Sequence, residues 1–218
     1  MGYNVAIDGP AGAGKSTIAK LVAKEKGYIY VDTGAMYRGL AIHFLDKGIS
    51  AEETDKIVEA CQDADVTIRY EEGVQQVYLN DVNITARLRD EVVGNMASKS
   101  SAIPAVRAKL LELQRSLAKT QDVIMDGRDI GTCVLPEADV KVYLTASVET
   151  RAKRRYDELV EKGVSCDLNE IAKDIEERDH RDMTREIAPL KQADDAVLVD
   201  SSDMTIEEVV KAITDLCK

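Results

Sequence analysis

The stretch GPAGAGKS (residues 9–16) follows the apolar run YNVAID (residues 3–8) and leads into residues 15–25, where apolar residues recur on one helical face. It fits the pattern G-x-x-x-x-G-K-[ST], in which a strand, a glycine-rich loop and a helix bind nucleotide phosphates. The glycines let backbone N–H groups point at phosphate oxygens, and the helix N-terminus adds partial positive charge. The stretch therefore predicts a phosphate-binding loop (P-loop) on an α/β fold.

Two side chains of this loop have expected chemical roles. Lys15 would reach the β- and γ-phosphates of a nucleoside triphosphate, and the Ser16 hydroxyl would help hold Mg²⁺. The alternative is a tight turn without a ligand, which the flanking strand and helix patterns disfavour. We expect the donor nucleotide to contact Gly9, Pro10, Ala11, Gly12, Ala13, Gly14, Lys15, Ser16 and Thr17.

Strand and helix patterns alternate along the chain, which favours a doubly wound parallel sheet of about five strands flanked by helices. An exception is VTIRYEEGVQQVYLNDVNI (residues 66–84), which alternates apolar and polar residues and breaks at EEG and ND, as a small inserted antiparallel meander would. The other expected strands cover residues 28–32, 122–126, 140–146 and 196–200. The other expected helices cover residues 35–46, residues 205–216, and two segments after the meander. Pro104 opens the second of those two segments, and SSD (201–203) is the expected cap of the helix at 205–216.

Bulk composition restricts the class of protein. The chain has 218 residues, 44% hydrophobic and 32% charged, which suits one domain with a sizeable core. Its net charge of −11 disfavours wide contact with nucleic acid, which needs a basic stripe. No apolar run is long enough to span a membrane, and the N-terminus lacks the features of a signal peptide. We therefore expect a cytoplasmic monomer with neither a nucleic-acid nor a membrane partner.

Cysteines and histidines form no metal or nucleophile pattern. The four cysteines lie far apart without C-x-x-C spacing, which favours free thiols in a reducing compartment. His43 and His180 have no partner at motif spacing, and we expect His43 to pack within an amphipathic helix. No N-K-x-D or D-x-x-G sequence is present, which disfavours a GTPase, and no apolar strand ends in the Asp-Glu pair of a water-activating ATPase.

Arginines gather instead in three short segments. DTGAMYR places Arg38 on the first turns of a helix that begins directly after a strand. RAKRR puts three arginines at i, i+3 and i+4, and RDHRDMTR puts Arg178, Asp182 and Arg185 at i, i+4 and i+7, hence on one helical face each. Each segment could also be a solvated basic face or an ion-pair ladder. The following EIAPL ends the helix, which favours a cleft.

Taken in order and spacing, GPAGAGKST, DTGAMYR, the meander, LRDEVVGNMAS, IPAVR, DGRDIGT, RAKRR and RDHRDMTREIAPL resemble the bacterial cytidylate kinase family over nearly the whole chain. The resemblance implies transfer of the γ-phosphoryl group of ATP, with Mg²⁺, to CMP or dCMP. It also implies one kinase domain over residues 1–218, with a core (1–32, 104–147, 186–218), a monophosphate-binding region containing the meander (33–103), and a helical lid with the following helical segment (148–185).

The resemblance also implies roles for individual residues. The acceptor phosphate is gripped by Arg38, Arg128 and Arg185; the lid arginines Arg151, Arg154 and Arg155 close over ATP; Ser98, Arg107 and Asp129 read the cytosine edge; and Arg178 and Asp182 lie near the sugar. Thr33 and Tyr37 complete the expected acceptor site, and the expected catalytic set is Lys15, Arg128, Arg154 and Arg185. No general base is needed, because the attacking phosphate oxygen is already ionised.

One segment, VIMDGRDIGTCVLP (residues 123–136), combines several of these roles. Asp126, at a strand end, would support Mg²⁺ through water, and Gly127 would let the backbone turn sharply toward the ligand. Asp129 would accept a hydrogen bond from the cytosine amino group. Cys133 and DMT (182–184) depart from the family pattern, which affects only the expected preference between CMP and dCMP. The alternatives are another small P-loop kinase, acting on UMP, AMP or a shikimate-like acceptor, and a nucleotide-dependent switch.

Overall fold

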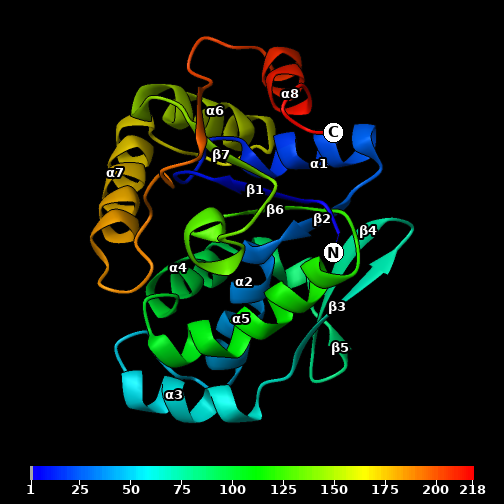
Figure 1. Cartoon of the computed structure of the whole chain (residues 1–218). Helices are drawn as coiled ribbons and strands as arrows, with labels where there is room; N and C mark the ends of the chain where they lie inside the picture. The colour runs from blue at the N-terminus through cyan, green and yellow to red at the C-terminus, as the bar shows by residue number, and fades with distance from the viewer. Residues whose placement is uncertain (1) are drawn as a thin grey trace.

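The computed structural model describes residues 2–218 and contains a five-stranded, all-parallel sheet in the order β2-β6-β1-β7-β8 (Figure 1). Apolar strands flanked by helices can form a parallel sheet because the helices cover both of its faces. The order places β1 at the centre and β2 at one edge. The strands are β1 (Asn4–Asp8), β2 (Ile29–Asp32), β6 (Val123–Gly127), β7 (Val140–Thr145) and β8 (Val197–Asp200).

Helices cover both faces of the sheet, so the sheet is doubly wound as predicted (Figure 1). Alternate residues of β6 divide between two cores: Val123 and Met125 pack in one and Ile124 in the other. The first core includes residues of α2 (Thr33–Asp46) and α5 (Pro104–Lys119), and the second includes residues of α1 (Lys15–Lys26) and α8 (Ile206–Thr214). The remaining helices are α3 (Thr54–Asp63), α4 (Glu91–Ser100), α6 (Val148–Glu161) and α7 (Leu168–Thr184), with short turns η1 (Thr85–Arg89) and η2 (Ile130–Val134).

The predicted meander is confirmed. It consists of β3 (Val66–Glu71), β4 (Val74–Leu79) and β5 (Val82–Asn83), paired antiparallel. Both hairpins close through two residues with positive φ, Glu72-Gly73 (51° and 78°) and Asn80-Asp81 (48° and 64°). Two successive positive φ values match the right-handed twist of the strands they join. The breaks at EEG and ND are therefore tight hairpin turns.

Helix starts differ from the sequence prediction in two places, and α3 was not predicted. Helix α2 begins at Thr33 instead of residue 35, because Asp32 caps it by accepting the Ala35 N–H at 2.9 Å. Helix α8 is capped by Thr205 in a reciprocal capping box with Glu208, so the SSD cap was wrong. The SSD serines bind elsewhere: Ser201 Oγ donates to the Thr145 carbonyl.

The P-loop turns away from β1 at Gly9, which has φ of 154°. A Cβ atom at this position would lie 1.9 Å from the Leu144 carbonyl oxygen of β7, so only glycine lets the loop pass over that strand.

None of the helices within residues 2–218 combines the length and the apolar composition that a membrane-spanning helix needs.

Candidate active site

A cavity of about 650 Å³ opens at the carboxyl ends of β1, β2 and β6. Its size is within the usual range for small-molecule sites, and its place is the one where open α/β sheets bind ligands. Among the predicted site residues, Gly9 and Pro10 do not line it. Gly9 instead packs on β7, and the Pro10 carbonyl accepts a hydrogen bond from Lys15. The predicted residues that line it are Ala11, Gly12, Ala13, Gly14, Lys15, Ser16, Thr17, Thr33, Tyr37, Arg38, Ser98, Arg107, Asp126, Arg128, Asp129, Arg151, Arg154, Arg155, Arg178, Asp182 and Arg185.

The P-loop end of the cavity is electropositive. Helix α1 begins after Gly14 without a side-chain cap, so its first N–H groups are available to an anion. Lys15 is buried, and its Nζ donates to the Pro10 carbonyl at 2.7 Å. Burial and the nearby positive charge of Arg128 lower the pKa of Lys15. A phosphate bound here would restore the preference of this amine for its charged form.

Asp126 lies at the base of the loop and accepts two hydrogen bonds. Ser16 Oγ donates to one carboxylate oxygen at 2.8 Å, and the Tyr30 hydroxyl donates to the other at 2.9 Å. Burial and the charge of Asp32 raise the pKa of Asp126 to about 6. A cation would relieve this cost, because an opposite charge favours the carboxylate form.

The donor atoms at this position fit magnesium. Hydroxyl and carboxylate oxygens are the ligands that Mg²⁺ prefers, and it usually takes one or two protein groups together with substrate phosphates and water. Within residues 2–218, no group of three His, Cys, Asp or Glu side chains could hold a metal by itself. Ser16 and Asp126 could therefore hold Mg²⁺ only together with a bound nucleotide.

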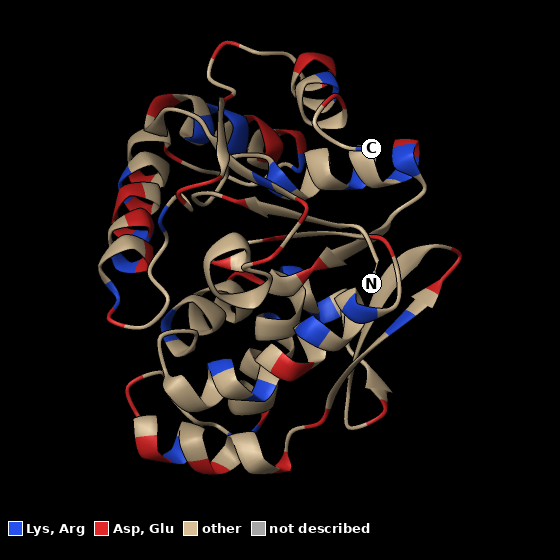
Figure 2. Ribbon diagram, in the orientation of Figure 1, with Lys and Arg blue, Asp and Glu red and all other residues tan. Residues whose placement is uncertain are grey.

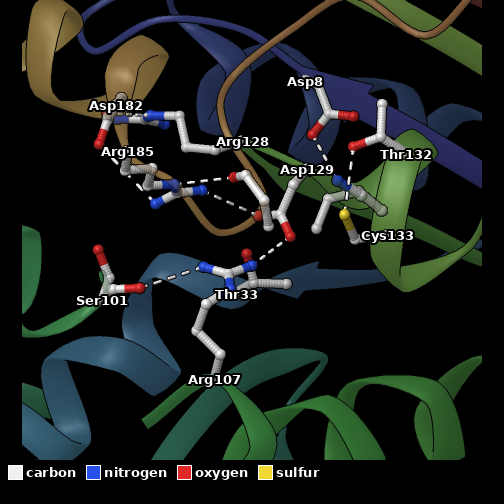
Figure 3. A network of polar contacts seen from close by, with 12 residues as sticks. Asp8, Thr33, Ser101, Arg107, Arg128, Asp129, Thr132, Cys133, Asp182 and Arg185 are labelled. Atoms are coloured by element: carbon white, nitrogen blue, oxygen red, sulfur yellow. Dashed lines mark hydrogen bonds and ion pairs between the residues drawn. The ribbon is translucent and has the colours of Figure 1, made fainter. Parts of the chain in front are cut away.

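The opposite end of the cavity holds three arginines and two carboxylates in one network (Figure 3). Arg128 Nε donates to Asp182 at 2.8 Å, and Arg185 lies 4.0 Å from another oxygen of Asp182. Arg185 Nη2 lies 3.4 Å from Asp129, whose second oxygen forms an ion pair with Arg107. Each carboxylate thus holds two arginine side chains in place, at nearly fixed positions in the cavity wall.

Two further arginines add positive charge without a directly paired carboxylate. Arg38 and Arg178 form no ion pair within residues 2–218, and the Nε of Arg178 is buried without a hydrogen-bond partner there. Burial and the charge of Arg128 lower the pKa of Arg178 to about 10, and burial lowers that of Arg38. Because buried polar groups are normally satisfied, this arrangement favours an anionic ligand.

The three arginines of RAKRR are held differently from one another. Arg151 is buried and donates to the Ala11 carbonyl at 2.9 Å and to Asp179 of α7 at 2.6 Å. Arg154 donates to the Ser201 carbonyl at 2.7 Å, and Arg155 pairs with the half-buried Glu158 on the same helix. Arg151 therefore links the P-loop to α6 and α7, whereas Arg155 extends from an exposed helix face. Figure 2 shows that basic and acidic residues are mixed along α6 and α7.

Of the residues expected to read a base, Ser98 lies on α4, Arg107 lies on α5 and Asp129 follows β6. The Ser98 hydroxyl is buried with no partner within residues 2–218, which leaves it free for a ligand. Arg107 donates to the Ser101 carbonyl at 3.3 Å and lies 5.7 Å from the centre of the Tyr37 ring. The Thr33 hydroxyl donates to the Asp126 carbonyl at 2.7 Å, so it can offer a ligand only its acceptor lone pairs.

Gly127 is required for a reason other than the predicted sharp turn. It does not have positive φ, but a Cβ there would lie 2.6 Å from Ile130 Cδ1 and 2.8 Å from Thr33 Oγ1. Close approach of α2 to the segment after β6, not backbone conformation, explains the glycine. The prediction of a glycine-dependent turn was therefore wrong.

Sequence reasoning missed Asp8, Tyr30 and Asp179. Asp8 accepts the N–H groups of Ile130 and Gly131, each at 2.7 Å, and so fixes the chain that follows Asp129 (Figure 3). Burial raises the pKa of Asp8 to about 6. The position of Asp8 at the end of a strand directly before the P-loop was a usable signal, but its partners lie more than 120 residues away in the sequence.

Comparison with known proteins agrees with this geometry. The family model described as cytidylate kinase matches residues 5–218. The cytidylate kinase of Caldicellulosiruptor saccharolyticus is 50% identical over 213 residues, which cover 98% of this chain and 94% of that protein. The cytidylate kinase of Lactobacillus johnsonii is 48% identical, over 97% of this chain and 92% of that protein.

A solved structure shares the fold at low sequence identity. An uncharacterized protein from Eubacterium ventriosum matches with a TM-score of 0.51 and 12% identity, over 98% of this chain and 96% of that one. At this identity the match supports the fold alone.

Proposed function

The chain belongs to the cytidylate kinase family and transfers the γ-phosphoryl group of ATP to CMP or dCMP, and from this premise we propose how its own residues carry out the transfer. The observation that carries the proposal is one cavity with a P-loop at one end and excess arginine at the other. Two polyanions must meet in this reaction, so the main tasks are to align them and to offset their repulsion.

The donor end binds ATP through the P-loop backbone, the N-terminus of α1 and Lys15. Lys15 donates to the β- and γ-phosphates in place of its present bond to the Pro10 carbonyl. Ser16 and Asp126 would hold Mg²⁺ there, and the ion would supply positive charge that offsets the charge of the nucleotide phosphates. Arg151, Arg154 and Arg155 approach the phosphates from the lid, and Arg151 also donates to the Ala11 carbonyl of the loop.

The acceptor end binds the CMP phosphate through Arg38, Arg128 and Arg185. Arginine suits this task because its planar guanidinium pairs with two phosphate oxygens and keeps its charge. The attacking oxygen is already ionised at neutral pH, so proton abstraction is unnecessary. Asp129 and Asp182, each bound to arginines, then act as anchors for those side chains and as hydrogen-bond acceptors for the nucleoside.

Base recognition rests on Asp129, Arg107 and Ser98. Cytosine presents an amino group where uracil presents a carbonyl oxygen, so an acceptor carboxylate favours the cytosine edge. The Ser98 hydroxyl, unpartnered within residues 2–218, is the second candidate contact. On the sugar side, Arg178 and Asp182 contact the ribose or deoxyribose.

Asp129→Asn should lower the preference for CMP over UMP by at least about tenfold, because asparagine offers uracil a donor and weakens the hold on Arg107 and Arg185. The measurement is ADP release with CMP, dCMP, UMP, AMP and shikimate as acceptors. Asp157→Asn, an exposed change on α6, is the control and should leave the ratio unchanged. An unaltered CMP to UMP ratio in Asp129→Asn, or a preference of the unmodified protein for AMP, would contradict this assignment of base recognition.

Hydrolysis of ATP without acceptor should be slower than transfer to CMP by roughly a hundredfold or more. We propose that residues 148–185 close over ATP only when the acceptor is bound and so exclude water. ADP release measured with and without CMP tests this. Equal rates in the two conditions would contradict a closing lid.

We also propose that the chain acts as a monomer in the cytoplasm, with the division into core (1–32, 104–147, 186–218), monophosphate-binding region (33–103) and lid (148–185). Residues of this chain line both the donor and the acceptor end of the proposed site. The four cysteines are free thiols, which suits a reducing compartment.

A further inference from the structure

The meander contacts the sheet at the edge strand β2 (Figure 1). Strand β2 pairs with β6 on one side only, so alternate backbone groups on its other side have no neighbouring strand. Such groups need partners when they are shielded from water. Tyr30 and Asp32 have backbone groups on this unpaired side, and Asp32 is also the last residue of the strand.

Two side chains of the meander bind these groups. Gln75 binds both backbone groups of Asp32. Its Oε1 accepts a hydrogen bond from the Asp32 N–H at 2.9 Å, and its Nε2 donates one to the Asp32 carbonyl at 3.1 Å. The Tyr70 hydroxyl donates to the Tyr30 carbonyl at 3.0 Å. The side-chain amide of Gln75 thus pairs with Asp32 much as the peptide group of an added strand would.

Gln75 and Tyr70 lie directly opposite each other on β4 and β3. Their side chains share a face with Val66, Val77 and Leu79, which are buried in the core. This inner face is apolar where it meets α2 and polar where it meets β2. A shift of β4 by one residue relative to β3 would turn Gln75 away from β2, so the contact of Gln75 with β2 also favours the observed register.

The next residue along, Gln76, lies on the opposite face. Its Oε1 accepts a hydrogen bond from Asn83 Nδ2 at 3.4 Å, within the meander itself. It has no contact with the β2 edge among the hydrogen bonds of the described residues. Gln75 and Gln76 are therefore chemically identical neighbours of which only one binds the core sheet.

The residue held by Gln75 starts the acceptor-binding helix. Asp32 is the N-cap of α2, and Thr33, Tyr37 and Arg38 on its first turns line the cavity. We propose that Gln75, assisted by Tyr70, is a positioning residue for the acceptor site: it fixes the Asp32 peptide and thereby directs the first turns of α2 toward CMP. The inference rests on the proposed placement of the acceptor phosphate at Arg38.

Gln75→Glu tests the inference with almost no change of shape. The carboxylate can still accept the Asp32 N–H but cannot donate to the Asp32 carbonyl, and it repels that oxygen. The KM for CMP should rise about tenfold, the size expected for a lost and partly reversed hydrogen bond, while the KM for ATP stays within about twofold. Gln76→Glu adds the same charge one residue away and should leave both constants unchanged.

Tyr70→Phe provides a second variant that keeps the apolar packing, and its KM for CMP should rise severalfold. The inference fails if Gln75→Glu and Tyr70→Phe leave the KM for CMP unchanged, or if the KM values for ATP and CMP rise equally, which indicates general loosening. Arg38→Ala separates the two proposals. If Arg38→Ala raises the KM for CMP and Gln75→Glu does not, only the role of Gln75 is wrong; if neither does, the placement of the acceptor is wrong.

Discussion

Lys15→Ala should lower kcat by about a hundredfold to a thousandfold while the protein stays folded. The amine lies where the loop, the N-terminus of α1 and Arg128 surround the expected β- and γ-phosphates. Fixed positive groups there offset the charge that develops on the transferred group. Removing one such group from a water-excluded site typically lowers kcat by two to three orders of magnitude, or about 3–4 kcal/mol of transition-state stabilisation. Single-turnover ADP formation with saturating CMP measures the effect on the chemical step.

Loss of structure can be distinguished from loss of chemistry in this variant. Burial and Arg128 lower the pKa of Lys15 in the folded protein, so the charged amine opposes folding at neutral pH, below its pKa in the unfolded chain. Without ligand, the Tm of Lys15→Ala should therefore equal or exceed that of the unmodified protein. Lys24→Ala, an exposed change on the same helix, is the matched control and should retain full activity. Normal CMP phosphorylation by Lys15→Ala would contradict the role of the P-loop.

Local signals allowed much of the fold and of the donor end to be predicted. The P-loop is contiguous in sequence, so its residue spacing is itself the geometry. The meander was predictable because alternating residues and two-residue turns act over short distances. By the same logic the cap of α8 was predictable, because Thr205 and Glu208 have the spacing of a capping box. The expected cap SSD (residues 201–203) lies upstream of this box and has no residue at the matching spacing.

The contacts that were missed join segments far apart in the chain. Asp8 binds the backbone at Ile130 and Gly131, and Tyr30 binds Asp126, because β6 lies between β2 and β1 in the sheet. Strand order was not available from hydrophobic patterns, since such patterns indicate that a segment is a strand but not which strands lie beside it. The link from Gln75 to Asp32 was hidden for a further reason. A glutamine in an alternating strand has no distinguishing pattern until the edge strand beside it is known.

Arg128→Ala should reduce kcat/KM for CMP by about a thousandfold or more. Arg128 acts at both ends of the cavity: its Nε donates to Asp182 on the acceptor side, and among nearby charges it is the largest cause of the lowered pKa of Lys15 on the donor side. It can therefore offset charge on the acceptor phosphate and on the transferred group together. The KM for ATP should change far less than that for CMP. Steady-state kinetics with each substrate varied in turn measure both.

The control must account for Asp182, which the substitution leaves as a buried carboxylate without its closest partner. That loss alone can destabilise the fold, because an unpaired buried charge is costly. Adding Asp182→Asn to Arg128→Ala should restore much of the lost Tm but none of the lost activity. Arg69→Ala, on the outer face of the meander, removes an equal charge and should have no effect on kinetics. If the double variant regained activity together with stability, Arg128 would serve the fold and not the transfer.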